Sequence, residues 1–436
     1  DVARAAGRAF GSHVRAEGKK SCLLGWDVRE SSPRLKEAFG EGLLRTGLEV
    51  IRIGVVPTPA LYFAVHELGA GAGAMVTGSH NPPDQNGFKL SVGPASLHGE
   101  AIRALAGRIE EENFATGEGS TRDAEILEAY HRMVVGKCAS PRPLKVVLDC
   151  GNGCAGLAAP RIFRELGHEV VSLYEEPDGR FPNHQPDPTV RKLMDELCRR
   201  VVAEGADLGV GYDGDADRIG VVDEKGTLLW GDQLLALLAR DLLSRRPGAK
   251  VIFDVKCSQG LEEDIAAHGG EPIMWKTGHS LTKAKMKEEQ APLAGEMSGH
   301  IFLGEDFYGH DDAIYTSAFF ARYLAGQDRS LSALRESLPA YVNSPEIRIA
   351  CADEAKFRIV EEVGRTLERE HSVVKIDGVR ARIGGGWGLL RASNTQPVLV
   401  LRFEAGSERE LEEIIGTFRR ELERFPEVEW DEGADH

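Results

Sequence analysis

Residues 208–222 read Leu208-Gly-Val-Gly-Tyr-Asp213-Gly-Asp-Ala-Asp217-Arg-Ile-Gly-Val-Val222, an acidic loop between two short apolar runs. Carboxylates at positions i, i+2 and i+4 of a looped chain can converge on one hard cation such as Mg²⁺ or Ca²⁺, so Asp213, Asp215 and Asp217 are candidate metal ligands. An EF-hand is the rival interpretation, because Glu224 stands at the twelfth position of such a loop. It is disfavoured because Arg218 occupies the sixth position, where the turn needs glycine, and because a strand follows. We therefore predict a metal site at the end of a buried strand, with a solvated acidic turn as the alternative.

Strand-like and amphipathic helical runs alternate on both sides of this loop, which is typical of βα units with mostly parallel sheets. Lys145-Val-Val-Leu-Asp149 turns on Gly151-Asn-Gly153 into a helix, and Val251-Ile-Phe-Asp254 leads to another near residues 261–268. Three α/β units of roughly one hundred residues fit before about residue 340. After it, two long helical runs and several short strands predict an α+β layer. The expected domain bounds are 1–125, 126–226, 227–339 and 340–436.

The composition is that of a soluble globular protein, with 42% hydrophobic and 28% charged residues over 436 positions. The 53 basic and 69 acidic side chains give a net charge of −16, which argues against a generic nucleic-acid binder or a polybasic membrane binder. Seven scattered cysteines indicate a reducing, cytoplasmic setting, and Cys150 and Cys154 lack a second ligand pair for zinc. The longest apolar stretch, residues 234–239, is far too short to cross a membrane. The chain begins at Asp1 with no leader pattern, so we expect the natural N-terminus to lie upstream.

Three further loops concentrate glycine with hydroxyl or charged groups, and each alone could be a polar turn. Thr77-Gly-Ser-His-Asn-Pro82 precedes Lys89 and places Ser79 beside His80. Gly295-Glu-Met-Ser-Gly-His300 offers a carboxylate and a hydroxyl that can bind two vicinal sugar hydroxyls. Arg391-Ala-Ser-Asn-Thr395 has the donors of a phosphate or carboxylate cradle. Lys256 and Lys276-Thr-Gly-His279 follow other strand ends, and no P-loop is present.

Together, in this order and spacing, the four loops resemble those of the α-D-phosphohexomutase family over essentially the whole chain. Within it the bacterial phosphomannomutase/phosphoglucomutase branch is most similar, because Lys276-Thr-Gly-His279 and the Arg-Ala-Ser-Asn-Thr loop are typical of it. Phosphoglucosamine mutases usually carry glutamine where Met297 stands, and Ser-Gly-Thr in place of Ser393-Asn-Thr395. The resemblance implies three similar mixed-sheet α/β domains and a C-terminal α+β domain around a central active-site cleft.

The resemblance also implies a reaction: reversible conversion of hexose 6-phosphates and 1-phosphates of glucose and mannose, through a phosphoserine and a hexose 1,6-bisphosphate. It implies Mg²⁺ as the metal and glucose 1,6-bisphosphate as activator. Glu296 and Ser298 would bind the 3- and 4-hydroxyls, which do not distinguish glucose from mannose. The implied catalytic residues are Ser79, His80, Lys89, Arg218 and His279; the substrate-binding residues are Arg29, Lys256, Glu296, Ser298, His300, Arg391, Ser393, Asn394 and Thr395; and the metal ligands are Ser79, Asp213, Asp215 and Asp217.

General acid and base roles stay open between Lys89, Arg218, His279 and His300, with the two histidines best suited to proton transfer near neutral pH. Family members usually carry a Tyr-Asp-x-Arg-Gly segment before the first helix, which precedes the start of this chain, whereas Arg29 is present. A phosphoglucosamine mutase, a metal-dependent sugar-phosphate phosphatase and a non-catalytic sugar-phosphate sensor are the alternatives. We expect hexose phosphates as partners, neither nucleic acid nor a membrane, and a monomer with a dimer as the alternative.

Overall fold

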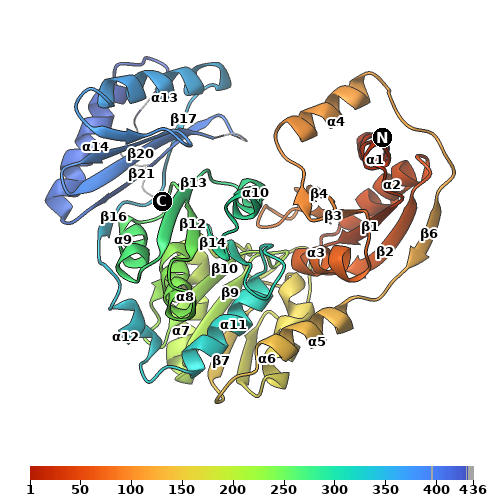
Figure 1. The fold of residues 1–436 in the computed structure, drawn as a ribbon, viewed down its shortest axis with the longest axis horizontal. Coiled ribbons are helices and arrows are strands. Elements are labelled where there is room, and N and C mark those ends of the chain that lie inside the picture. The colour runs from red at the N-terminus through yellow and green to blue at the C-terminus, as the bar shows by residue number, and fades with distance from the viewer. Residues whose placement is uncertain (394–395, 429, 431–436) are drawn as a thin grey trace.

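Four successive units, each with its own β-sheet, make up the computed structural model, which describes residues 1–393, 396–428 and 430 (Figure 1). The first unit, in red and orange, and the fourth, in blue, lie at opposite ends, and the second and third lie between them. The first three sheets mix parallel and antiparallel pairs, while the fourth is antiparallel throughout its described strands. This confirms the predicted fold class of three mixed-sheet α/β units and one α+β unit.

The first unit is a sheet in the order β5-β4-β3-β1-β2-β6, covered by helices. Its close-packed helix pair α1 and α2 depends on glycine, since a Cβ on Gly7 would lie 2.1 Å from the carbonyl oxygen of Phe39. β3 is buried at every position, and it ends at Thr77 next to the serine loop. The elements are α1 (Val2–Ala16), β1 (Ser21–Trp26), α2 (Ser32–Leu44), β2 (Glu49–Val55), α3 (Thr58–Glu67), β3 (Ala72–Thr77), β4 (Gly87–Val92), β5 (Ala95–Ser96), α4 (Glu100–Glu110) and β6 (Ser120–Asp123).

The second unit is a sheet in the order β11-β10-β9-β7-β8. The antiparallel pair β9 and β10 is fully buried and flanks the acidic loop, as the apolar runs on each side of it predict. The elements are α5 (Leu127–Lys137), β7 (Lys145–Asp149), η1 (Cys154–Leu157), α6 (Ala159–Glu165), β8 (Glu169–Leu173), η2 (Arg191–Met194), α7 (Asp195–Glu204), β9 (Leu208–Tyr212), β10 (Ile219–Asp223) and β11 (Leu228–Leu229).

The third unit is a sheet in the order β13-β12-β14-β15. Its helix α11 starts at a side-chain cap, because Asp312 accepts a hydrogen bond from the backbone N–H of Tyr315 at 2.8 Å. The elements are α8 (Gly231–Arg245), β12 (Lys250–Asp254), α9 (Gln259–Ala267), β13 (Glu271–Trp275), α10 (His279–Glu289), β14 (Leu293–Gly295), β15 (Ile301–Leu303), α11 (Ala313–Ala325) and α12 (Leu331–Arg335).

The fourth unit packs two amphipathic helices against an antiparallel sheet in the order β16-β21-β20-β19-β18, with β17 also paired to β21. Ser407 caps the second helix by accepting from the backbone N–H of Glu410 at 3.4 Å. The elements are β16 (Val342–Asn343), β17 (Ile347–Ala350), α13 (Asp353–Leu367), β18 (Ser372–Val374), β19 (Val379–Ile383), β20 (Gly386–Ala392), β21 (Val398–Ala405) and α14 (Glu408–Leu422).

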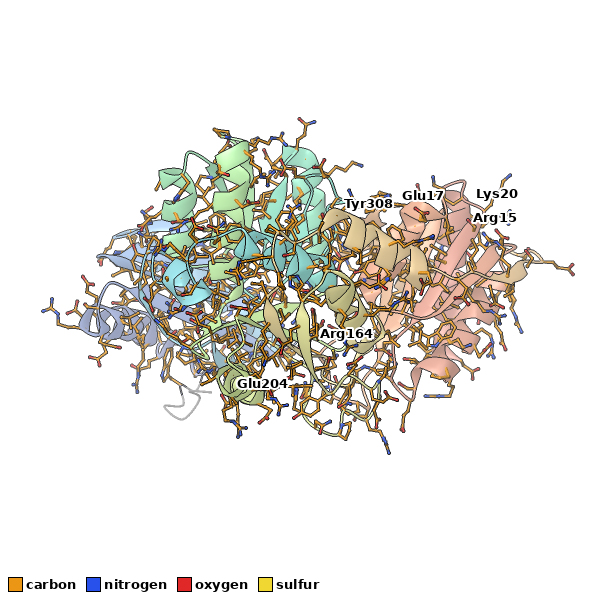
Figure 2. All side chains as sticks on the ribbon, turned by 90° about the horizontal axis from the view of Figure 1, so that it is seen from below. Arg15, Glu17, Lys20, Arg164, Glu204 and Tyr308 are labelled. Atoms are coloured by element: carbon orange, nitrogen blue, oxygen red, sulfur yellow. The ribbon has the colours of Figure 1, made fainter. Side chains whose placement is uncertain are left out.

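The hydrophobic cores show how the units are joined. One continuous cluster of buried side chains runs through the first three units, from Leu23 to Leu338, whereas the fourth unit has a core of its own. Tyr308 of the third unit, labelled in Figure 2, reaches α3 of the first, where its ring stacks on His66 at 4.4 Å. No helix in the described part of the chain is both long and apolar enough to span a membrane. The first three units therefore form a common framework, onto which the fourth docks.

Candidate functional site

The acidic loop lies between β9 and β10, and its three aspartates are completely buried. One carboxylate oxygen from each of Asp213, Asp215 and Asp217 lies within 4.8 Å of the others. The Oδ1 atoms of Asp215 and Asp217 are buried without a hydrogen-bond partner. Burial, Asp215 and Asp217 together raise the pKa of Asp213 well above its usual range. Unpartnered oxygens and mutual repulsion are what a divalent cation would relieve, so these residues fit a metal such as Mg²⁺.

Backbone contacts from the first and third units hold this loop in place. The N–H of Thr58 donates to the carbonyl of Asp215 at 2.9 Å, and the N–H of Ala313 donates to that of Ala216 at 3.2 Å. Gly214 permits the closest approach, because a Cβ there would lie 2.4 Å from the carbonyl oxygen of Ser79. The acidic loop (residues 213–217), called the metal loop below, is thus in contact with the first and third units as well as its own.

The serine loop presents its hydroxyl directly to the metal loop. Ser79 has a left-handed backbone with φ of 48°, which is unusual for a residue with a side chain. Its Oγ donates to Asp213 Oδ2 at 2.6 Å and lies 3.3 Å from His80 Nδ1. Burial, followed by the charge of Arg218, lowers the pKa of His80 to about 4, so its ring is neutral near pH 7. The arrangement brings a nucleophilic oxygen to the edge of the acidic cluster.

Arg29 supports the serine loop from within the protein. Its side chain is fully buried, and its Nε donates to Asp27 Oδ2 at 3.1 Å. Its two terminal nitrogens donate to four backbone carbonyls of the loop, those of Ser79, Asn81, Pro82 and Gln85. All five N–H donors of the guanidinium are therefore used. This corrects the expectation of a substrate contact: Arg29 has no donor left for a ligand and instead shapes the loop.

Lys89 comes from β4 of the first unit and reaches the metal loop. Its Nζ donates to Asp215 Oδ2 at 2.7 Å and also to Asp217 Oδ2. Burial alone would lower the pKa of Lys89, but Asp215 and Asp217 raise it well above its usual range. A fixed positive charge therefore stands next to the three carboxylates, at the place where phosphoryl charge would need compensation.

A histidine pair from the third unit lies beside Arg218. Arg218 Nε donates to His300 Nε2 at 2.9 Å, and the rings of His279 and His300 stack at 5.5 Å. Nδ1 of His279 lies 3.1 Å from Asp311 Oδ2, and Nδ1 of His300 lies 3.2 Å from the same oxygen. Sequence reasoning did not single out Asp311, because an acidic residue just before a helix is usually only part of a cap.

The sugar loop is organised around Glu296, which is 2% exposed. Its Oε1 accepts from the N–H of Gly278 at 3.1 Å and from Thr282 Oγ1 at 2.9 Å, while Oε2 accepts from Ser298 Oγ at 3.2 Å. The carboxylate and hydroxyl expected to read a sugar are thus adjacent, and one carboxylate oxygen is fixed by the loop that carries His279.

The candidate phosphate loop belongs to the fourth unit. Arg391 Nη2 pairs with Asp377 Oδ2 at 3.0 Å, and that oxygen also accepts from the N–H of Thr277 at 3.2 Å. The Ser393 side chain accepts from the N–H of Gln396 at 3.2 Å. Lys256 Nζ lies 3.5 Å from Glu346 Oε2, at the junction of the third and fourth units. Asn394 and Thr395, also expected to bind phosphate, lie outside the described residues.

Other residues at the site were missed by sequence reasoning. Thr58 Oγ1 donates to Asp215 Oδ2 at 2.5 Å, and Gln185 Nε2 donates to the carbonyl of His80 at 2.5 Å. Neither lies in a glycine-rich loop, so nothing in their local sequence marked them.

Comparison with known proteins agrees with this geometry. Family models of phosphoglucomutase/phosphomannomutase match the chain in four parts: alpha/beta/alpha domain I over residues 1–116, domain II over 127–226, domain III over 230–341 and the C-terminal domain over 346–421. A phosphomannomutase/phosphoglucomutase of Pseudomonas aeruginosa is 48% identical over 95% of this chain and 90% of its own length. A phosphoglucomutase of Neisseria gonorrhoeae is 42% identical over 99% of this chain and 94% of its own.

Among solved structures, a phosphoglucomutase/phosphomannomutase family protein of Burkholderia thailandensis superimposes with a TM-score of 0.92 at 43% identity, covering 97% of this chain and 93% of that one. The matches extend over all four units and include each loop of the site. The chain therefore belongs to the phosphoglucomutase/phosphomannomutase family.

Proposed function

We propose that this protein interconverts hexose 6-phosphates and hexose 1-phosphates of glucose and mannose, with Ser79 carrying the transferred phosphoryl group. The observation that carries the proposal is the 2.6 Å contact between Ser79 Oγ and Asp213 Oδ2 in an acidic cluster that fits a metal. The same cluster supports Mg²⁺ as cofactor, held by Asp213, Asp215, Asp217 and an oxygen on Ser79. When bound, the ion would offset charge on the moving phosphoryl group.

The chain's own residues supply the remaining parts of the transfer. A sugar hydroxyl oxygen bonds to phosphorus as the bond from Ser79 Oγ breaks, and the hydroxyl proton passes to a nearby base. Ser79 Oγ leaves with the bonding electron pair and takes up a proton, which restores the serine hydroxyl. Lys89 and Arg218 compensate negative charge, and His279 and His300 are the candidate proton acceptors. The product of this step is a hexose 1,6-bisphosphate, which returns its other phosphate to Ser79 after turning round.

Two separate sets of residues would bind the bisphosphate in both of its orientations. Arg391 with residues 393–395 would bind the phosphate that is not reacting, and Lys256 would approach it from the third unit. Glu296 and Ser298 would bind the 3- and 4-hydroxyls, which exchange places when the ring is reversed. Glucose and mannose differ at C2, so a site that reads O3 and O4 accepts both.

The direct assay is incubation with Mg²⁺, mannose 1-phosphate and a trace of glucose 1,6-bisphosphate, with Ser79→Ala as control. Formation of mannose 6-phosphate by the wild type alone is the expected result. Release of inorganic phosphate without 6-phosphate would favour a phosphatase, and neither product would favour a sensor. A parallel reaction with glucosamine 6-phosphate tests the remaining alternative, a phosphoglucosamine mutase. Faster turnover of that substrate than of mannose 1-phosphate would favour this alternative.

A further inference from the structure

Asp377 lies in the loop between β18 and β19, and one of its oxygens has partners in two units. Its Oδ2 pairs with Arg391 Nη2 of the candidate phosphate loop at 3.0 Å and accepts from the backbone N–H of Thr277 in the third unit at 3.2 Å. The side chains of Asp377 and Arg391 are only 15% and 12% exposed, so water and salt screen this ion pair less than an exposed one. One carboxylate oxygen therefore joins the phosphate loop to the third unit.

A close backbone approach fixes Asp377 against Arg391. Gly378, the next residue, has a φ of 81°, and a Cβ there would lie 2.4 Å from the carbonyl oxygen of Leu390 and 2.6 Å from Arg391 Cβ. The loop thus lies directly on the end of β20 because position 378 has no side chain. Nε of Arg391 is buried without a hydrogen-bond partner in the described part of the chain, so the guanidinium keeps a donor that Asp377 does not use.

Thr277 is in turn bonded to the sugar loop, residues 295–300. Its Oγ1 donates to Asp254 Oδ2 at 2.8 Å, and the Oδ1 atom of Asp254 accepts from the N–H of Met297 at 3.1 Å. The N–H of Gly278 donates to Glu296 Oε1 at 3.1 Å. Asp254 and Glu296 are both buried. Two routes of hydrogen bonds therefore connect the residues after β13 to the loop expected to bind the sugar.

The order of strands in the third unit explains how Asp254 reaches both loops. β12 pairs in parallel with β13 on one side and with β14 on the other, so the carboxyl ends of the three strands lie at one edge of the sheet. Asp254 ends the middle strand, Thr277 follows β13, and Met297 follows β14. The contacts thus run without a break from Arg391 of the fourth unit, through Thr277, to the sugar loop.

We propose that Asp377 is a positioning residue, which sets the separation between the phosphate loop and the sugar loop so that the phosphate and the ring of a hexose phosphate are bound together. The inference deepens the proposed function and rests on it for its kinetic consequence. Asp377 acts through Arg391 on one side and through Thr277 on the other, without a substrate contact of its own.

The role follows from the two partners of Asp377. An ion pair that served only the stability of the fourth unit would need Arg391 alone, whereas the bond to Thr277 crosses to the unit that contains the sugar loop. A hexose bisphosphate that turns round must be held at a phosphate and at its ring hydroxyls in both orientations. A fixed separation of the two binding places lowers the entropic cost of each binding event, so the bisphosphate is retained until the second transfer.

Hydrogen exchange followed by NMR measures the contact between the units without any assay of activity. The backbone N–H of Thr277 donates to Asp377, so its deuterium exchange should be about tenfold faster in Asp377→Ala than in the wild type. Glu368→Gln is the matched control, because it removes an exposed ion pair with Lys375, two residues before Asp377. Equal exchange of the Thr277 amide in Asp377→Ala and in the wild type, or the same acceleration in the control, would overturn the proposal.

The kinetic readout is the amount of free glucose 1,6-bisphosphate released per molecule of glucose 6-phosphate formed from glucose 1-phosphate. For Asp377→Ala we expect this ratio to rise about tenfold and kcat/KM to fall about tenfold, since the intermediate escapes before it has turned. A variant that was merely less stable would lower the amount of active enzyme but leave the ratio unchanged. Asp377→Asn, which keeps an acceptor for Thr277 and loses the charge that attracts Arg391, should raise the ratio by a smaller factor.

Failure of this inference and failure of the proposed function give different results. An unchanged ratio in Asp377→Ala, or the same rise in Glu368→Gln, would contradict the role of Asp377 while the wild type still forms glucose 6-phosphate. A wild type that forms no glucose 6-phosphate would contradict the mutase function, and the exchange of the Thr277 amide would then decide the role of Asp377 alone.

Discussion

At the scale of single residues, Arg29 stabilises the unusual backbone conformation of Ser79. The left-handed backbone of Ser79 carries a conformational cost of about 1–2 kcal/mol, which the surrounding contacts must offset. The guanidinium of Arg29 binds the carbonyls of Ser79 and of three other loop residues, and Asp27 holds it in turn. The arginine thereby fixes the conformation that aims Ser79 Oγ at Asp213.

Arg29→Lys tests this device, because it keeps the charge and removes the planar set of donors. With several loop carbonyls left without a partner, the free energy of unfolding should fall by about 3 kcal/mol and kcat should fall at least tenfold. Urea unfolding and steady-state kinetics measure both quantities. Arg34→Lys, at an exposed position of α2, is the control and should change neither. A stable, fully active Arg29→Lys enzyme would show that the hydrogen bonds from the Arg29 guanidinium to the loop carbonyls are not needed.

His184 predicts a pH dependence of stability. Its Nε2 lies 3.0 Å from Asp149 Oδ2 and its Nδ1 lies 2.8 Å from the carbonyl of Gln185, so the doubly protonated ring satisfies both acceptors. Burial opposes this, but Asp149 outweighs it, and the pKa of His184 is raised above its usual value. Its contribution to stability is therefore complete below about pH 6.5 and is lost as pH rises through the raised pKa.

Thermal unfolding of wild type and His184→Gln at several pH values measures this contribution. The variant should be destabilised most at pH 5.5 and least at pH 8.5. A stability difference between wild type and His184→Gln that grows toward alkaline pH would contradict the raised pKa of His184.

At the scale of elements, the site depends on how closely the loops between strands approach each other. The loop between β9 and β10 touches the loop after β3 only because position 214 has no side chain, since a Cβ there would lie 2.4 Å from the carbonyl oxygen of Ser79. Phosphoryl transfer is sensitive to displacements of about 1 Å, which can cost about 100-fold in rate.

Gly214→Ala should therefore separate the two loops and lower kcat about 100-fold, measured with saturating substrate and Mg²⁺. Gly107→Ala in α4 is the matched control, because nothing lies within 4 Å of a Cβ at that position. It should leave kcat unchanged and stabilise the helix by about 0.5–1 kcal/mol. Equal kcat values for the two variants would show that the close approach is unimportant.

Elements with strong apolar patterns were predictable from sequence, and those without them were not. The expected strands at residues 145–149 and 208–212 match β7 and β9, and the two long helical runs expected after about residue 340 match α13 and α14. β6 was missed because all four residues of this edge strand are exposed, so it lacks an apolar pattern. Asp311, Gln185 and Asp377 were missed for another reason: they act through contacts with residues far away in the chain, which no local spacing reveals.

At the scale of the whole molecule, the charges on the outer surface differ from those at the candidate site. Acidic residues such as Glu361, Glu408 and Glu412 are exposed on the outer helices of the fourth unit. In Figure 2, Arg15, Glu17 and Lys20 lie together at the outer end of the first unit, so charges of both signs cover that surface. Lys89, Arg218 and Arg391 are instead the basic residues that we propose act at the site, and their positive charge would reconcile a net charge of −16 with an anionic ligand.

Docking of the fourth unit is the other feature at this scale. Arg380 of β19 stacks on Trp387 at 3.7 Å and donates to the carbonyls of Val255 and Cys257 on either side of Lys256. Burial lowers the pKa of Arg380 to about 10, which still leaves it charged at neutral pH. Arg402 adds a hydrogen bond to the carbonyl of Lys256 itself. Arg380 and Arg402 thus fix the backbone around Lys256 against the fourth unit, which also carries the candidate phosphate loop.

Arg380→Leu should loosen this docking. We expect KM for hexose 6-phosphate to rise about tenfold, since the phosphate contacts are no longer prearranged, and calorimetry to show the fourth unit unfolding first. Arg382→Leu, two residues along the same strand but with an exposed side chain and a single ion pair at 3.7 Å, is the control. Identical KM values in both variants would contradict the role of the interface.

The most direct test of the central claim is the intact mass of the protein after incubation with glucose 1,6-bisphosphate and Mg²⁺. The account predicts that the wild type gains the mass of one phosphoryl group, that peptide analysis finds it on Ser79, and that Ser79→Ala gains nothing. A phosphoryl group retained by Ser79→Ala, or found on another residue of the wild type, would contradict the account.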